Sequence, residues 1–166
     1  MLLLKIIKMI KEDFNKIKES EKFKAIISRA RLVSCFLNDD QIKKLWEFNF
    51  FSEETKSTYT FFVDNNDVVL KDTNILISRN QNPEEVMLGN LKLEEKEVIS
   101  IANFVLVKKY QEENFSKMIL SIESQNRRIL WNVTVVLKNL NVANIKINDR
   151  TSEVVEDKLF SPFTKQ

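Results

Sequence analysis

The feature that most constrains this chain is an internal repeat. Residues 45–51 read LWEFNFF, and residues 130–136 read LWNVTVV, at an offset of 131 − 46 = 85 positions. The same offset, without a gap, aligns further pairs: Cys35 with Leu120, Leu37 with Ile122, and Phe62-Val63-Asp64 with Ile147-Asn148-Asp149. A repeat of this length indicates one structural unit that occurs twice.

Hydrophobic spacing predicts the same order of elements in both copies. Residues 2 to about 30 and 93–110 have mostly helical spacing, and the segments that follow them are short, apolar and rich in alternation. The strands predicted in this way are 32–37, 42–51, 57–63 and 68–70 in the first copy, then 117–122, 128–137, 142–147 and 153–155 in the second. Polar clusters such as 64–67 separate them as turns. Each unit is therefore expected to be a helix followed by four antiparallel strands.

A proline marks the border between the copies. Asn82 followed by Pro83, Glu84 and Glu85 is typical of a helix N-cap with an acidic first turn, which predicts a short helical turn ending near Gly89. We therefore divide the chain into a first unit, 1–82, and a second unit, 83–166. The helix at 93–110 is apolar over most of its circumference and is expected to be buried between other elements.

The second unit resembles the PepSY domain family, whose fold is a cystatin-like helix on a curled sheet. The resemblance lies in the tail of the unit, where the pattern of apolar residues, aspartate, threonine, glutamate and valine is matched by Ile145, Ile147, Asp149, Thr151, Glu153 and Val154. Ser152 stands where the family usually has glycine. The first unit resembles the family through residues 62–64 and 68–69. The fold class expected is therefore α+β, with two tandem cystatin-like units, each a helix packed on a four-stranded antiparallel sheet.

The resemblance implies a non-catalytic module that inhibits or chaperones peptidases, or binds peptides or proteins. The leading prediction is thus a protein- or peptide-binding, regulatory module that takes a partner strand at a sheet edge or concave face. The ligand groups assigned by position on the third and fourth strands are Thr58, Thr60, Lys146 and Arg150. A homodimer through sheet edges or helices is a further expectation.

The residue inventory excludes several kinds of catalysis. The chain has no histidine, which excludes serine–histidine and cysteine–histidine nucleophilic sites and the usual zinc sites. One glycine in 166 residues excludes the phosphate-binding loops that need several. The single cysteine, Cys35, lies in an apolar run and is expected to be buried and inert. We expect no enzyme, no cofactor and no metal.

The carboxylates do not change this expectation. Residues 64–67 superficially resemble a calcium loop, but the sixth position lacks glycine and Ile75 stands where the twelfth-position glutamate belongs. Asp64 and Asp149 could be proposed as a catalytic pair because they occupy equivalent positions. Turn chemistry explains both features more simply.

Paired basic residues support a second hypothesis. Lys43 and Lys44 precede Trp46, and Arg127 and Arg128 precede Trp131, an arrangement that suits single-stranded nucleic acid. On alternating strands, however, both tryptophans share a face with other apolar side chains, so we expect them in the core. The alternative function is therefore a nucleic-acid-associated protein that uses Lys43, Lys44, Arg127 and Arg128.

Charge and hydropathy bear on location. The net charge of +2 produces no strong overall field. Lys5 and Lys8 interrupt the apolar N-terminus, which is too short to span a bilayer and has no cleavage site. We expect a cytoplasmic protein without a transmembrane segment, while an interfacial membrane helix at the N-terminus is the alternative to packing on the sheet.

Overall fold

The computed structural model describes residues 4–27, 29–39, 44–75 and 83–161. Its helices are α1 Leu4–Glu19, α2 Glu21–Ile26 and α3 Glu95–Tyr110, with one 3-10 turn, η1, at Leu88–Asn90. Its strands are β1 Ala30–Asp39, β2 Lys44–Ser52, β3 Ser57–Asp64, β4 Asp67–Ile75, β5 Phe115–Gln125, β6 Arg128–Leu137, β7 Val142–Asn148 and β8 Val154–Phe160.

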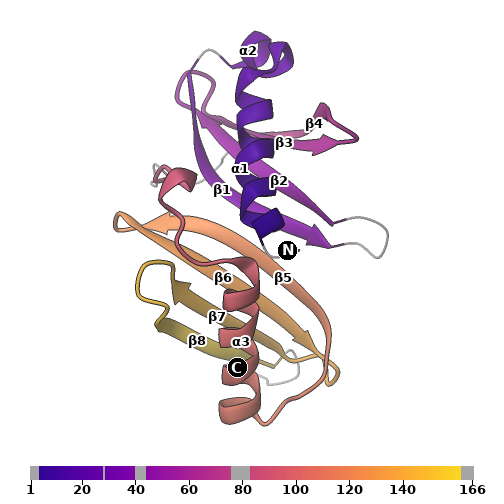
Figure 1. Ribbon diagram of the computed structural model, residues 1–166, viewed down its shortest axis with the longest axis vertical. Coiled ribbons are helices and arrows are strands. Elements are labelled where there is room, and N and C mark those ends of the chain that lie inside the picture. The colour runs from indigo at the N-terminus through magenta and orange to yellow at the C-terminus, as the bar shows by residue number, and fades with distance from the viewer. Residues whose placement is uncertain (1–3, 28, 40–43, 76–82, 162–166) are drawn as a thin grey trace.

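All eight strands form one antiparallel sheet, in the order β4-β3-β2-β1-β5-β6-β7-β8 (Figure 1). The expectation of two separate four-stranded units was therefore wrong. The physical reason is the pairing of β1 with β5, which runs from Ser34 opposite Glu123 to Leu37 opposite Leu120. This pairing satisfies the backbone edge that each four-stranded group would otherwise leave open.

The joint between β1 and β5 is symmetric with respect to the sequence repeat. Phe36 lies opposite Ser121, and these two residues are 85 positions apart. Behind the joint, Trp46 and Trp131 are also 85 apart, and their rings meet edge to face at 6.2 Å between centroids. Equivalent residues therefore contact each other, so the sheet has an approximate two-fold axis at Phe36 and Ser121.

The repeat changes its spacing beyond the second strand of each half. Phe48 lies opposite Phe61, whereas the equivalent Val133 lies opposite Ile145, which gives a third-strand offset of 145 − 61 = 84. The chain between the paired residues Val133 and Ile145 is thus one residue shorter than the chain between Phe48 and Phe61. The ungapped alignment of Phe62-Val63-Asp64 with residues 147–149 is therefore displaced by one position.

The helices cover the apolar face of the sheet in both halves (Figure 1). In the first half, Phe14 of α1 stacks on Phe50 at 6.0 Å, and Phe23 of α2 meets Phe50 edge to face at 4.7 Å. In the second half, Val98, Ala102 and Leu106 of α3 are buried and belong to the same core as the strands beneath. Burial of these side chains supplies the main favourable term in folding.

Local signals explain where the helices begin. The Ser20 side chain accepts a hydrogen bond from the Phe23 N–H at 3.1 Å and starts α2. At α3, the Glu97 carboxylate accepts from the Glu94 N–H at 2.7 Å, as in a capping box. The expectation that α3 is buried all round was wrong, because Phe104 keeps 64% of its surface exposed on the side away from the sheet.

The tryptophans and the cysteine are buried, as predicted. Trp46 and Trp131 are 4% and 2% exposed, and Cys35 is fully buried, where desolvation raises the pKa of its thiol. The turn at Asp64–Asp67 is confirmed, with Asn65 and Asn66 in the left-handed region. The short helical turn predicted to end near Gly89 starts later than expected: residues 83–87 are not helical, and the turn is η1 at Leu88–Asn90. Its proposed cap, Asn82, lies outside the described residues.

Candidate functional site

The segment 83–93, which is irregular apart from η1, lies across the joint between the two halves. We call it the strap. It is fixed to the first half by two hydrogen bonds: the Val86 N–H donates to the Leu32 carbonyl at 2.8 Å, and Arg31 Nε donates to the Pro83 carbonyl at 3.0 Å. The strap therefore continues from the first half onto the turns of the second half.

Glu84 joins the strap to the β5–β6 turn. Its carboxylate accepts the N–H of Asn126 at 2.9 Å, the N–H of Arg127 at 2.8 Å and the hydroxyl of Ser124 at 3.0 Å. Asn126 and Arg127 both have positive φ, of 53° and 60°, and this conformation turns their N–H groups toward one carboxylate. The hydrogen bond from the Arg127 backbone is the main reason that the pKa of Glu84 lies below its usual range.

Asp149 joins the far end of the strap to the β7–β8 turn. Its carboxylate accepts the N–H groups of Lys92 at 2.9 Å and Leu93 at 3.1 Å, together with Trp131 Nε1 at 2.9 Å. The residue is 3% exposed. A buried carboxylate with three donors is a fixed structural anchor, which agrees with the preference for turn chemistry over a catalytic pairing of Asp149 with Asp64.

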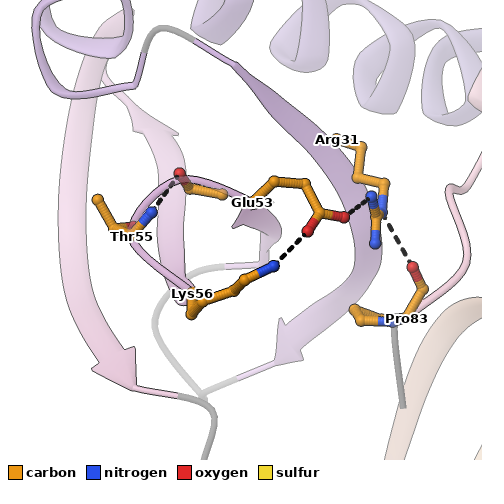
Figure 2. A network of polar contacts seen from close by, with 6 residues as sticks. Arg31, Glu53, Thr55, Lys56 and Pro83 are labelled. Atoms are coloured by element: carbon orange, nitrogen blue, oxygen red, sulfur yellow. Dashed lines mark hydrogen bonds and ion pairs between the residues drawn. The ribbon is translucent and has the colours of Figure 1, made fainter. Parts of the chain in front are cut away.

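A polar network holds the strap at its first-half end (Figure 2). Arg31 pairs with Glu53, which also accepts from Lys56 Nζ at 2.8 Å. The Arg31 guanidinium lies over the Phe51 ring, 5.2 Å from its centroid. Hydrogen bonds from Lys56 and then from Arg31 hold the pKa of Glu53 below its usual range. Arg31 is thus engaged by the protein itself.

Between the strap and the two turns lies an open groove of about 1160 Å³. It is lined by the strap residues from Pro83 to Lys92, by the β5–β6 turn and by the β7–β8 turn. Four of its cations are exposed: Lys92, Arg127, Arg128 and Arg150. Within the part of the chain that the structure describes, none of these four side chains has an ion-pair partner. We call this site the cationic groove.

The acidic residues of the groove are mostly occupied. Glu84 and Asp149 each accept three hydrogen bonds, and Glu153 accepts one from the Thr151 hydroxyl at 2.9 Å. Met87, 54% exposed, adds an apolar side chain to the lining. The arrangement offers guanidinium groups to an anionic ligand, and planar guanidinium binds carboxylate or phosphate through two parallel hydrogen bonds.

The structure brings together residues that the sequence assigned to different hypotheses. Arg127 and Arg128 were predicted for nucleic acid and Arg150 for a peptide, and all three line the cationic groove. Lys44 does not join them. Because β1 runs antiparallel to β5, the end of β1 and the start of β2 lie at one end of the strands and the β5–β6 turn lies at the other. Lys44 is instead 3.9 Å from Glu95. Lys43 lies outside the described residues.

The remaining predicted ligand residues lie on the strands and outside the groove. The Thr60 hydroxyl donates to Asn49 Oδ1 at 2.7 Å, and Lys146 pairs with Glu123 at 3.2 Å. The Thr58 hydroxyl is buried and has no hydrogen-bond partner among the described residues. These three side chains do not form one site with Arg150.

Sequence reasoning missed the contribution of the strap. Glu84 was interpreted as a first-turn acid of a helix, and Lys92 was not singled out. A usable signal was present in the predicted hairpin of β6 and β7, since an antiparallel pair places the start of one strand beside the end of the next. Leu130 does lie opposite Asn148, which brings Arg128 and Arg150 to the same end of the sheet.

Comparisons with known proteins bear on the fold. No protein-family model and no curated protein matches the chain. A solved structure from Clostridium difficile 630, described as a "putative lipoprotein", is similar, with a TM-score of 0.58 and 16% identity. The similarity covers 84% of this chain and 88% of that one. At this identity it supports the fold alone.

The described helices bear on whether the chain crosses a membrane. None of them is both long enough and apolar enough to cross a membrane. The predicted cytoplasmic location stays a prediction. The expected packing of the N-terminal helix on the sheet is confirmed, since Ile10 and Ile17 are buried in the core and Phe14 stacks on Phe50.

Proposed function

We propose that this protein is a non-catalytic, PepSY-like binding module that takes an acidic segment of a protein or peptide partner in the cationic groove. The observation that carries the proposal is the convergence of Arg127, Arg128 and Arg150 in one groove, without ion-pair partners among the described residues. The protein's own Glu84 is held at the wall of this groove by the backbone N–H groups of Asn126 and Arg127, which leaves the arginine guanidinium groups to a ligand.

The lining favours a peptide that combines acidic and apolar side chains. The three arginines come from two turns and can bind carboxylates at separate positions along a segment. Met87 and Ile129, which also line the groove, offer apolar contact. The walls are held by hydrogen bonds through Glu84 and Asp149, so the backbone that carries the cations is fixed before the ligand arrives.

Nucleic acid is the second candidate, and one observation favours it. Arg127 and Arg128 lie in the same groove as a third arginine, and phosphate oxygens suit guanidinium as well as carboxylates do. The test must therefore separate the two anions.

The experiment is fluorescence anisotropy with three probes: a labelled peptide rich in glutamate and leucine, its glutamine counterpart and a labelled single-stranded oligonucleotide. We expect the acidic peptide to bind best. A variant with Arg127, Arg128 and Arg150 changed to serine should bind it about 3- to 140-fold more weakly, since exposed charge pairs contribute roughly 0.2–1 kcal/mol each.

The matched control changes Lys96, Lys108 and Lys138 to serine, which removes the same charge from exposed positions outside the groove. This control should keep most of the affinity. An equal loss of affinity in both triple variants would mean that net charge alone explains the binding, and it would contradict the proposal that the peptide binds in the groove. Tighter binding of the oligonucleotide, lost in the arginine variant alone, would replace the peptide proposal by the nucleic-acid one.

A further inference from the structure

One edge of the sheet carries an unusual set of side chains. β8 is the last strand, and among the described residues no strand pairs with its outer side. Three of its apolar side chains are largely exposed: Val155 at 48%, Leu159 at 43% and Phe160 at 55%. An unpaired edge with exposed apolar side chains is a template for another strand.

We propose that β8 pairs with β8 of a second copy of this chain, antiparallel and centred on Asp157. This inference is independent of the cationic groove. In this register Glu156 faces Lys158 of the other copy, Val155 faces Leu159 and Val154 faces Phe160. Apart from Asp157 on the axis, every side chain then meets one of matching character, and the two-fold axis produces each of these pairs twice.

Neighbouring registers lose this match. A shift by one residue places Glu156 opposite Leu159, or Val155 opposite Lys158. A shift by two, centred on Lys158 or Glu156, places Asp157 opposite Leu159 or Val155. Charged side chains would then face apolar ones, so the sequence of β8 itself selects the register centred on Asp157.

The charge of Asp157, the residue on the axis, is balanced within each chain. Asp157 would face its own copy, and like charges directly opposite are unfavourable. In each chain, however, Asp157 pairs with Lys109 and accepts a hydrogen bond from the Tyr110 hydroxyl at 2.6 Å. The axis therefore carries two neutralised pairs, and the end of α3 holds the strand in place.

The register of β7 with β8 gives a further reason. Lys146 lies opposite Glu156 and Ile147 opposite Val154, so the irregularity between them leaves Val155 without a partner on β7. In the dimer Val155 gains Leu159 of the other copy.

The test is sedimentation velocity on the full chain over a concentration series, with charge-reversal variants. Wild type should dimerise. Lys158→Glu should raise the dissociation constant roughly tenfold or more, because two opposite-charge pairs become like-charge pairs. The double variant Glu156→Lys with Lys158→Glu should restore dimerisation. Lys138→Glu, the same charge change in the exposed β6–β7 turn, is the control and should leave the constant unchanged.

A second measurement does not depend on surface charge. Val155→Cys and Leu159→Cys proteins are mixed under mild oxidation, and the mixture should form a cross-linked dimer faster than either variant alone, since Cys35 is buried. A wild type that stays monomeric to about 100 µM overturns the proposal. The proposal is also overturned if a dimer forms whose dissociation constant is unchanged by the charge-reversal variants and whose cross-linking is no faster in the mixture of cysteine variants.

Discussion

Removal of the Asp149 carboxylate tests the central anchor of the fold. Asp149→Ala leaves three donors without their acceptor: Trp131 Nε1 and the N–H groups of Lys92 and Leu93. Hydrogen bonds to charged groups contribute about 1.5–3 kcal/mol each, but water reaches part of the space, and single substitutions rarely cost more than about 4–5 kcal/mol. We therefore expect a loss of roughly 3–5 kcal/mol in the free energy of unfolding.

Asp149→Asn separates the three bonds. Leu93 N and Trp131 Nε1 both donate to Oδ1, whereas Lys92 N donates to Oδ2. An asparagine whose oxygen takes the Oδ1 position keeps two bonds and places an amide NH2 against the Lys92 N–H. The expected loss is about 1–3 kcal/mol, which is the cost of one unsatisfied donor together with the lost charge.

The assay is urea denaturation followed by tryptophan fluorescence at pH 7. Asp67→Ala, in the exposed β3–β4 turn, is the matched control and should stay within about 0.5 kcal/mol of wild type. The reasoning is refuted if Asp149→Ala also stays within about 1 kcal/mol of wild type at an unchanged slope.

Three further predictions concern the strap, the thiol and the core. The lowered pKa of Glu84 means that its contribution to stability is present above the usual value of 4.5 and is lost as the pH falls through the lowered folded-state pKa. Glu84→Gln should therefore lower the urea midpoint at pH 7 and reduce the difference in urea midpoint between pH 7 and pH 3. The control Glu113→Gln should change neither quantity. The Cys35 thiol, buried with a raised pKa, should react with a thiol reagent only in unfolding urea, and rapid labelling of the native protein would contradict its burial. Phe50→Ala should cost about 3–5 kcal/mol and exposed Phe104→Ala less than about 1, both measured by urea denaturation.

The sequence predicted elements better than their assembly. Alternation of apolar side chains located the strands and placed Trp46 and Trp131 in the core, because burial on one face of a sheet imposes a period of two. The same alternation cannot say which strand lies beside β1. Its pairing with β5 depends on backbone groups that are alike in every strand, so the single sheet was not predictable from side-chain pattern alone.

The candidate site was predicted in part. Arg127 and Arg128 were singled out as a basic pair before Trp131, and Arg150 by its position near the fourth strand, but the groove they share needs the strap as its second wall. The strap was misread because Pro83-Glu84-Glu85 has the composition of a helix start. Its backbone instead hydrogen-bonds to Leu32, and Glu84 accepts hydrogen bonds from the N–H groups of Asn126 and Arg127. These contacts depend on residues about 40 or more positions away in sequence.

The symmetry of the central joint has a consequence for truncation. Phe36 and Ser121 are equivalent positions, as are Trp46 and Trp131, so the contact between the halves is made by equivalent residues on both sides. Either half could therefore make nearly the same contact with a second copy of itself. Separated halves would each expose an unpaired strand and a bare tryptophan, and each would find in its twin a ready substitute for the lost half. The two halves of this one chain therefore pack against each other as the two subunits of a symmetric homodimer would.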